Sequence, residues 1–208
     1  MPDDDLNPAA TALENDFGPL AWFDGMIDHC RDSVEAAKKR GQPVVGIFCE
    51  FTPREVIQAA GALPVCLCGG SAATIPAAEE QLPSNLCPLI KSTFGSHLSG
   101  QDPFIECADL LVAETTCDGK KKMYELLGKS RSMYVLELPQ KTEDPDAFVF
   151  WTREVMKLKE HLQRRFRLCI TGNGLRQSIG LMNRERTLRR RLADLRAAKG
   201  DYVSPLEL

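Results

Sequence analysis

Four short apolar runs constrain the fold of this chain more than any other feature. They lie at 43–48, 63–67, 108–113 and 133–138. The runs are apolar at nearly every position, with Asp109 and Glu137 as the charged exceptions, which is typical of strands buried on both faces of a parallel sheet. Helix-forming stretches separate them. Because strands and helices alternate with short connections, the sequence predicts an α/β fold with a Rossmann-like parallel sheet flanked by helices.

The pattern changes on either side of this region. Residues 1–15 lack apolar periodicity, and we expect a disordered tail. Residues 16–140 are expected to form the Rossmann-like domain. From 141 to 208 the chain is expected to be helical, because Phe148, Trp151, Val155 and Leu158 begin a series of apolar residues spaced three or four apart. The sequence therefore predicts a C-terminal helical segment after the sheet.

Composition excludes several classes of function. The net charge of −3 gives no general affinity for nucleic acid or for an anionic membrane surface. No apolar run reaches the length of a membrane span. The first residues are acidic where a secretion signal would be basic, so we expect a cytoplasmic protein.

Eight cysteines are many for an intracellular chain, and six of them fall between Cys49 and Cys117. In a reducing compartment disulfides are not expected, so metal binding, redox chemistry and simple burial remain. Cys66 lies inside an apolar run and is interpreted as a core residue. Cys68 precedes two glycines and is a weaker ligand candidate.

Two cysteines occupy the same local position, after a strand and before a helix. Cys49 follows the run 43–48, and Thr52 is expected to cap the helix that starts at Pro53. Cys117 follows the run 108–113 and precedes a helix rich in lysine. The carboxyl ends of parallel strands are where open α/β sheets place ligands, and helix amides and lysines favour a thiolate. The alternative is that small buried cysteines fill the turns.

Cys87 belongs to a third motif, Leu-Pro-Ser-Asn-Leu-Cys-Pro at 82–88. Its two prolines fix the backbone, and Pro88 can start a helix. A rigid backbone of this kind aims a sulfur at a cluster, although a buried loop anchor would have the same sequence.

Together these motifs resemble the 2-hydroxyacyl-CoA dehydratase and benzoyl-CoA reductase family (the D-component type), including its double-cubane cluster proteins. The resemblance runs from about residue 40 to the end and covers what looks like the N-terminal half of a family member. It rests on Phe-Cys-Glu-Phe-Thr-Pro at 48–53, Leu-Pro-Ser-Asn-Leu-Cys-Pro-Leu-Ile-Lys at 82–91, Glu-Thr-Thr-Cys-Asp-Gly-Lys-Lys-Lys-Met-Tyr at 114–124 and Leu-Met-Asn-Arg-Glu-Arg at 181–186.

The resemblance implies an iron–sulfur cluster. Cys87 and Cys117 match cluster ligands of the family, and Cys49 matches a cysteine of the double-cubane branch, so the resemblance implies Cys87, Cys117 and Cys49 as the metal ligands of this chain. That branch has Cys-Pro-aromatic where this chain has Asp102-Pro103-Phe104, so a [4Fe-4S] cluster is expected rather than a double-cubane [8Fe-9S] cluster. The implied reaction is dehydration of a 2-hydroxyacyl-CoA through a ketyl radical. A separate ATP-dependent iron–sulfur activator protein would deliver the electron.

Family members are about twice as long as this chain, so the family's second Rossmann-like domain is expected to be absent. The resemblance therefore implies that a second dehydratase subunit, or the missing C-terminal half, completes the site. Two further functions are compatible with the motifs. One is a double-cubane, ATP-dependent reductase of small molecules. The other is a non-catalytic truncated or split-gene subunit.

Overall fold

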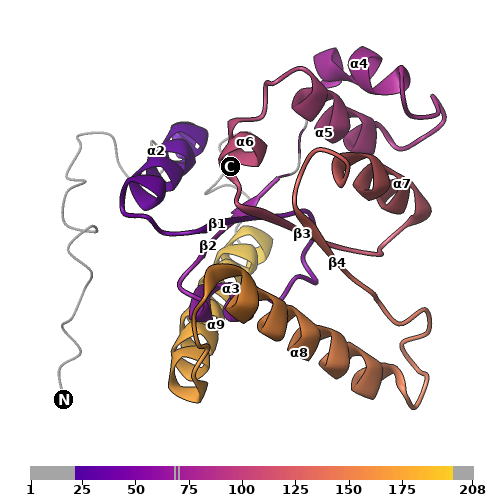
Figure 1. Ribbon diagram of the computed structural model, residues 1–208. Helices are drawn as coiled ribbons and strands as arrows, with labels where there is room; N and C mark the ends of the chain where they lie inside the picture. Colours follow the sequence, from indigo (N-terminus) through magenta and orange to yellow (C-terminus); the bar gives the residue numbers. More distant parts are fainter. Residues whose placement is uncertain (1–21, 68, 70, 199–208) are drawn as a thin grey trace.

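The computed structural model describes residues 22–67, 69 and 71–198, so the expected tail at 1–15 and the ligand candidate Cys68 lie outside the described residues. A parallel sheet forms the centre (Figure 1), and this confirms the α/β fold. Its strands, in the spatial order β2-β1-β3-β4, are β2 (Leu63–Cys66), β1 (Val44–Ile47), β3 (Leu110–Glu114) and β4 (Met133–Leu136).

The order of the strands creates a switch point between β1 and β3. The chain passes from β1 to β2 on one side, and then to β3 on the other side of β1. In register, Val45 lies beside Pro64 on one flank and beside Leu110 on the other. The connections after β1 and β3 therefore leave the same edge of the sheet in opposite directions, which opens a crevice at their carboxyl ends.

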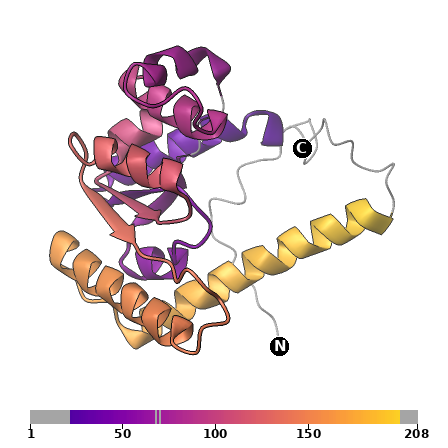
Figure 2. The same cartoon turned by 90° about the vertical axis from the view of Figure 1, so that its right-hand side faces the viewer.

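Helices cover both faces of the sheet (Figures 1 and 2). One face carries α3 (Arg54–Ala59), α8 (Ala147–Phe166) and α9 (Gly172–Ala198). The other carries α2 (Met26–Lys39), the 3₁₀ turn η2 (Ala72–Thr74), α4 (Ile75–Glu79), α5 (Pro88–Leu98), α6 (Pro103–Cys107) and α7 (Asp118–Leu127).

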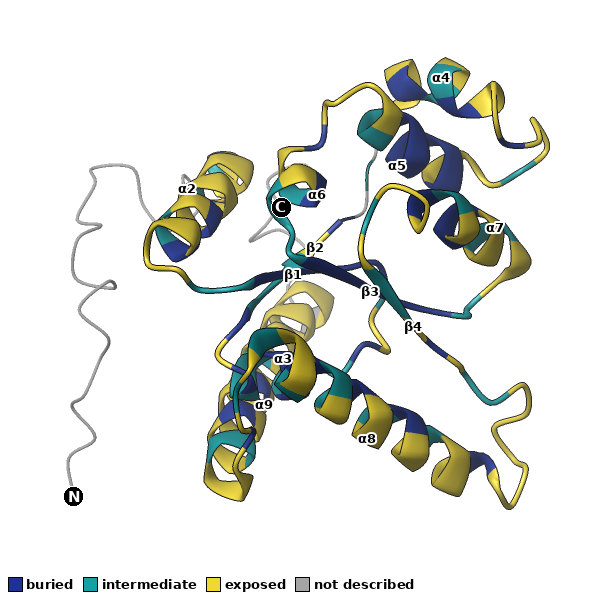
Figure 3. Cartoon of the chain, viewed as in Figure 1, coloured by how far each residue is buried: buried dark blue, intermediate teal, exposed yellow. Residues whose placement is uncertain are grey.

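The central strand β3 shows why the apolar runs lack alternation. Leu110 and Val112 pack into the cluster on the α8 side, and Leu111 and Ala113 pack into the cluster on the α7 side. All five residues of β3 are buried (Figure 3). Because both faces are covered by helices, every position of the strand must be compatible with the core.

Packing around β1 is very close at Gly46. A Cβ atom there would lie 2.3 Å from Leu67 Cδ1 and 2.9 Å from Leu111 Cδ2. Both leucines are almost fully buried, so neither has room to move aside. Glycine at this position is therefore required by packing rather than by backbone conformation.

The two C-terminal helices pack onto the rest of the fold. Leu158 and Leu162 of α8 are fully buried against the strands. The amino-terminal half of α9 packs on α3 and includes buried Met182, and Arg54 pairs with Glu185 at 3.2 Å. Among the described residues, no helix has the length and apolarity required to cross a bilayer.

Two expectations for single residues are wrong. Thr52 does not cap α3, because Pro53 occupies the N-cap position and the Thr52 hydroxyl donates to buried Glu114 instead. Cys66 is exposed rather than buried. It ends β2, which among the described residues is an edge strand and is only half-buried at its other positions.

Candidate functional site

Cys49 and Cys117 lie at the switch point of the sheet. Cys49 is two residues beyond the end of β1, and Cys117 is the N-cap residue of α7, three residues beyond the end of β3. β1 and β3 are hydrogen-bonded neighbours, so both loops leave the sheet at the same edge. Cys117 is exposed and Cys49 is half-buried.

Lys120, in the first turn of α7, joins these two loops. Its ammonium donates to the carbonyl oxygen of Phe48 at 3.3 Å and contacts the Cys49 sulfur directly. On the other side of Cys117, the Thr116 hydroxyl lies 3.8 Å from the same sulfur. Residues on both sides of Cys117 therefore hold the Cys49 thiol.

A buried carboxyl group lies behind this contact. Glu114, the last residue of β3, is completely buried, and its Oε1 accepts a hydrogen bond from the Thr52 hydroxyl. Its Oε2 has no hydrogen-bond partner among the described residues. Burial raises the pKa of Glu114 above its ordinary value, while the Thr52 hydrogen bond and the positive charge of Lys120 partly oppose the rise. The site therefore has a carboxyl group that holds its proton more tightly than an ordinary glutamate does.

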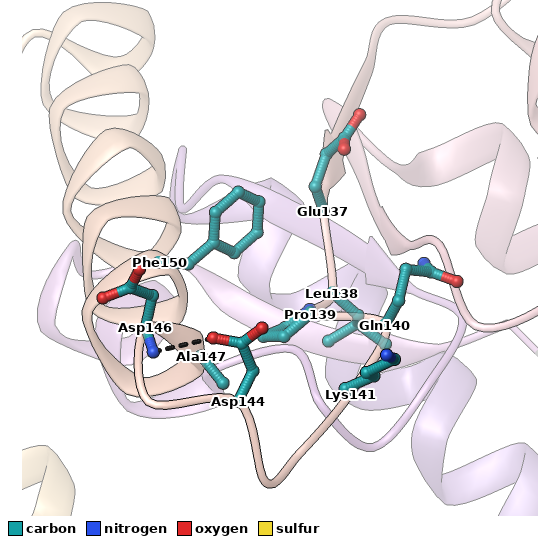
Figure 4. Close-up of a pocket in the computed structure, with 9 residues that line it drawn as sticks. All are labelled: Glu137, Leu138, Pro139, Gln140, Lys141, Asp144, Asp146, Ala147 and Phe150. Atoms are coloured by element: carbon teal, nitrogen blue, oxygen red, sulfur yellow. Dashed lines mark hydrogen bonds between the residues drawn. The ribbon is translucent and has the colours of Figure 1, made fainter.

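The exit of β4 is tied to the Cys117 loop. The Leu138 amide donates to the Thr115 hydroxyl at 2.9 Å. Leu138 also lines a pocket of about 500 Å³ between the β4 exit and the start of α8 (Figure 4). Its charged lining residues are Glu137, Lys141, Asp144 and Asp146. Three carboxylates against one ammonium favour a neutral or cationic group there over a phosphate.

Cys87 lies at the start of a helix that packs against the Cys117 helix. Cys87 is exposed and is the N-cap residue of α5, with Pro88 in its first turn, as the sequence predicted. The α5 start contacts the α7 start so closely that a Cβ on Gly119 would lie 2.8 Å from Ile90 Cδ1 and 3.3 Å from Leu86 Cδ2. The Cys87 and Cys117 segments are therefore neighbours across this contact.

A buried lysine fixes the segment before Cys87. The Lys91 ammonium donates to the carbonyl oxygen of Ser84 and to Glu79 Oε1, both at 2.6 Å. Its side chain is only 9% exposed, and at that exposure an ion pair resists screening by salt. The segment at 83–88 is thus held by proline rings and by this lysine.

The structure brings the three cysteine segments to one region, but the described residues do not form a complete set of metal ligands. Among residues 22–67, 69 and 71–198, no three Cys, His, Asp or Glu side chains come close enough to hold a metal ion. The donor types fit an iron–sulfur cluster, since Cys87 and Cys117 are free, exposed thiols at helix starts, where unpaired amides favour negative charge. The described residues therefore fit as contributors to a cluster rather than as its complete ligand set.

Asp102 has a structural role that accounts for its position. Its Oδ1 accepts hydrogen bonds from the amides of Phe104 and Ile105, each at 3.0 Å, and so caps α6. The side chain is nearly buried, which raises its pKa above the ordinary value despite these bonds. Asp102, where the resemblance to the double-cubane branch led us to expect a cysteine, thus serves as a helix cap.

Sequence reasoning missed the roles of Lys120 and Glu114. A signal for Glu114 was present, because it directly continues the apolar run 108–113 and must share the burial of that strand. Lys120 is one of three consecutive lysines, and only the packing of α7 against the β1 exit distinguishes it from its neighbours. The sequence suggested that these lysines act on Cys117, whereas the lysine–thiol contact in the structure is from Lys120 to Cys49.

The family model for the 2-hydroxyglutaryl-CoA dehydratase D-component matches residues 49–208, which include all three cysteine motifs. The chain belongs to this family. The match confirms the resemblance seen in the motifs, and it extends through α9 to the last residue of the sequence.

Curated relatives within this dehydratase family support the assignment. YjiM of Escherichia coli (strain K12), provisionally named a dehydratase subunit, is 45% identical over 74% of this chain. One of the benzoyl-CoA reductase subunits of Thauera aromatica is 28% identical over 70% of the chain. The beta subunit of lactoyl-CoA dehydratase of Anaerotignum propionicum is 24% identical over 80% of it. The matches span 40%, 38% and 43% of the respective relatives, so the chain covers about two fifths of their length.

Proposed function

We propose that this dehydratase-family chain is a subunit, or an N-terminal part of one, of an iron–sulfur enzyme that dehydrates a 2-hydroxyacyl-CoA by one-electron reductive activation. In this proposal the thiols of Cys87 and Cys117 bind a [4Fe-4S] cluster, and Cys49 adjoins it. The observation that carries the proposal is the meeting of three cysteine segments at the carboxyl edge of the sheet, in a chain of this family.

Each of the chain's own residues has a defined task in this proposal. When bound, the cluster would supply an electron of low potential and an iron with an open coordination position. The packed starts of α5 and α7 would hold the two exposed thiols beside each other. Lys120 would keep the Cys49 loop against the Cys117 loop, and its positive charge would offset part of the negative charge that thiolates bring.

The proposal requires partners. No three possible ligands come together among the described residues. Further ligands are therefore expected from a second dehydratase subunit or from a C-terminal half supplied by another polypeptide. The electron would come from an ATP-dependent iron–sulfur activator protein. Two of the curated relatives are themselves named as subunits of acyl-CoA enzymes, which supports an assembly of this kind.

Iron binding tests the central claim without any requirement for activity. The full chain is purified without oxygen together with the second dehydratase subunit, supplied with ferrous iron and sulfide, and assayed for bound iron, sulfide and visible absorption. We expect Cys87→Ser and Cys117→Ser to lose most of the iron. Cys169→Ser is the matched control, because Cys169 is also exposed but lies away from the site. It follows α8, and the end of α8 contacts Asp109 at the amino end of β3, which is the opposite end of that strand from Cys117. Unchanged iron content in both site variants would instead support a non-catalytic role.

Turnover distinguishes the remaining alternatives. The chain is combined with an activator, ATP and the second subunit, and is offered 2-hydroxyacyl-CoA thioesters or small reducible molecules. Loss of water from a thioester supports the dehydratase. Two cubes per chain together with reduction of small molecules would support a double-cubane reductase, although Asp102 is engaged as a helix cap.

A further inference from the structure

The carboxyl-terminal half of α9 has no buried face in the part of the chain that the structure describes. Every residue from 186 to 197 is exposed, and α9 extends away from the body of the molecule (Figure 2). Twelve helical residues correspond to about 18 Å. These residues continue a helix of 27 residues, so their helical form propagates from the packed amino-terminal half.

A stripe of leucines at coiled-coil spacing runs from the amino-terminal half of α9 into this exposed half. Leu181, Leu188 and Leu195 recur every seven residues, and Leu192 lies four residues after Leu188. All four are exposed, with Leu188 at 55% and Leu195 at 62%. This spacing places Leu181, Leu188 and Leu195 at d positions of a heptad and Leu192 at an a position, while the preceding a position is Glu185, which pairs with Arg54 and Arg189. The stripe is a narrow seam, and its leucines stay exposed where Met182 is buried.

Arginines border the seam on both sides. Arg184 and Arg191 occupy g positions, and Arg189 and Arg196 occupy e positions, which are the positions that select a coiled-coil partner by charge. Among the described residues, Arg189 pairs only within α9, with Glu185 at 2.8 Å, and the other three form no ion pair. In a self-pair of either orientation, the e and g positions would bring arginine against arginine. The charge pattern therefore disfavours a second copy of this chain.

We propose that the seam at 181–196 docks an amphipathic helix of another polypeptide, with apolar a and d positions and glutamate or aspartate at the flanking e and g positions. The leucines would bury against the apolar positions of that helix, and the arginines would pair with its carboxylates. A lipid surface is a poorer match, because the seam is narrow and has no aromatic residue to anchor at an interface. The inference does not depend on iron binding and goes beyond the proposed reaction.

The test uses the full chain, without iron, and a fluorescent synthetic peptide with leucine at every a and d position and glutamate at every e and g position. A matched peptide carries lysine at e and g. We expect the glutamate peptide to bind at least about tenfold more tightly than the lysine peptide, and salt to reduce the difference. Leu188→Asp with Leu195→Asp should abolish binding, while circular dichroism shows the sheet domain intact.

Charge reversal gives the sharper readout. Arg184→Glu with Arg191→Glu should shift the preference toward the lysine peptide, whereas Arg190→Glu should leave it unchanged, because Arg190 lies at an f position on the opposite face of α9. Equal binding of both peptides, or binding of neither, would overturn the proposal. So would a dimer in sedimentation that Leu188→Asp dissociates, or stronger binding to anionic phospholipid vesicles than to the glutamate peptide.

Discussion

The buried carboxyl of Glu114 makes a pH-dependent prediction that can be worked out from the structure. Glu114→Gln keeps the shape of the side chain and the acceptor for the Thr52 hydroxyl, and it removes the ionisable proton. Leaving a buried polar oxygen without a partner costs about 1–3 kcal/mol, and more when the group is charged. Since the Glu114 side chain is completely buried and its Oε2 lacks a partner among the described residues, the variant should unfold less readily than the wild type at alkaline pH.

The sign follows from the raised pKa of Glu114. Near pH 4 the carboxyl is mostly protonated in both states, so the wild type and Glu114→Gln should have similar stability. As the pH rises from the unfolded-state pKa toward the higher folded-state pKa, the unfolded chain releases its proton first, and the wild type loses stability that the variant keeps. Above the folded-state pKa the difference should level off.

Urea unfolding between pH 4 and pH 8.5 measures this difference. A gain of about 2 kcal/mol corresponds to a midpoint shift of about 1 M, given a typical urea dependence of about 2 kcal/mol per molar. Glu154→Gln is the control, because Glu154 is also buried but is ion-paired with Lys157, so its replacement should destabilise the fold. A Glu114→Gln variant that is less stable than the wild type at pH 8 would show that the ionised carboxylate is stabilising, and the reasoning would fail.

Further predictions concern packing and the site. Gly46→Ala should destabilise the fold by about 1–3 kcal/mol, because the added Cβ has no space beside Leu67 and Leu111. Gly180→Ala should stabilise α9 by about 0.5–1 kcal/mol, because the added Cβ meets nothing within 4 Å. Thermal unfolding measures both changes. Lys120→Met should lower the iron bound after anaerobic reconstitution, whereas Lys121→Met should not, because the Lys121 ammonium bonds to Asp118 on its own helix. Equal iron in the two lysine variants would contradict the role given to Lys120. Leu162→Ala should cost about 2–5 kcal/mol in urea unfolding, since its side chain is fully buried, and a loss below about 1 kcal/mol would count against that packing.

The fold was predictable because strands that are buried on both faces are apolar at nearly every position. The apolar runs gave the strands to within a residue or two, and the alternation with helices gave parallel pairing. Thr52 and Cys66 were misjudged because their environments depend on other parts of the chain. Thr52 turns toward a carboxyl group 62 residues away, and Cys66 is exposed because β2 lies at an edge.

The three cysteine motifs could also be found from sequence, since proline, glycine and cysteine at fixed spacing are local features. Their relation to one another could not. The contact of Gly119 with Ile90 and the bridge from Lys120 to Cys49 join segments that are 29 and 71 residues apart. Periodicity reports only neighbours along the chain, so it says nothing about which loops meet.

By itself, the sequence determined a parallel sheet, the helix starts that follow Cys49, Cys87 and Cys117, and membership in a family that the comparisons confirm. Only the tertiary structure decided that Glu114 is buried behind the site, that Lys120 ties two loops together, and that the leucines of the α9 seam are exposed among the described residues. The physical reason is that local propensities act over a few residues, whereas burial and ion pairing depend on strand order and on the elements that pack above each face.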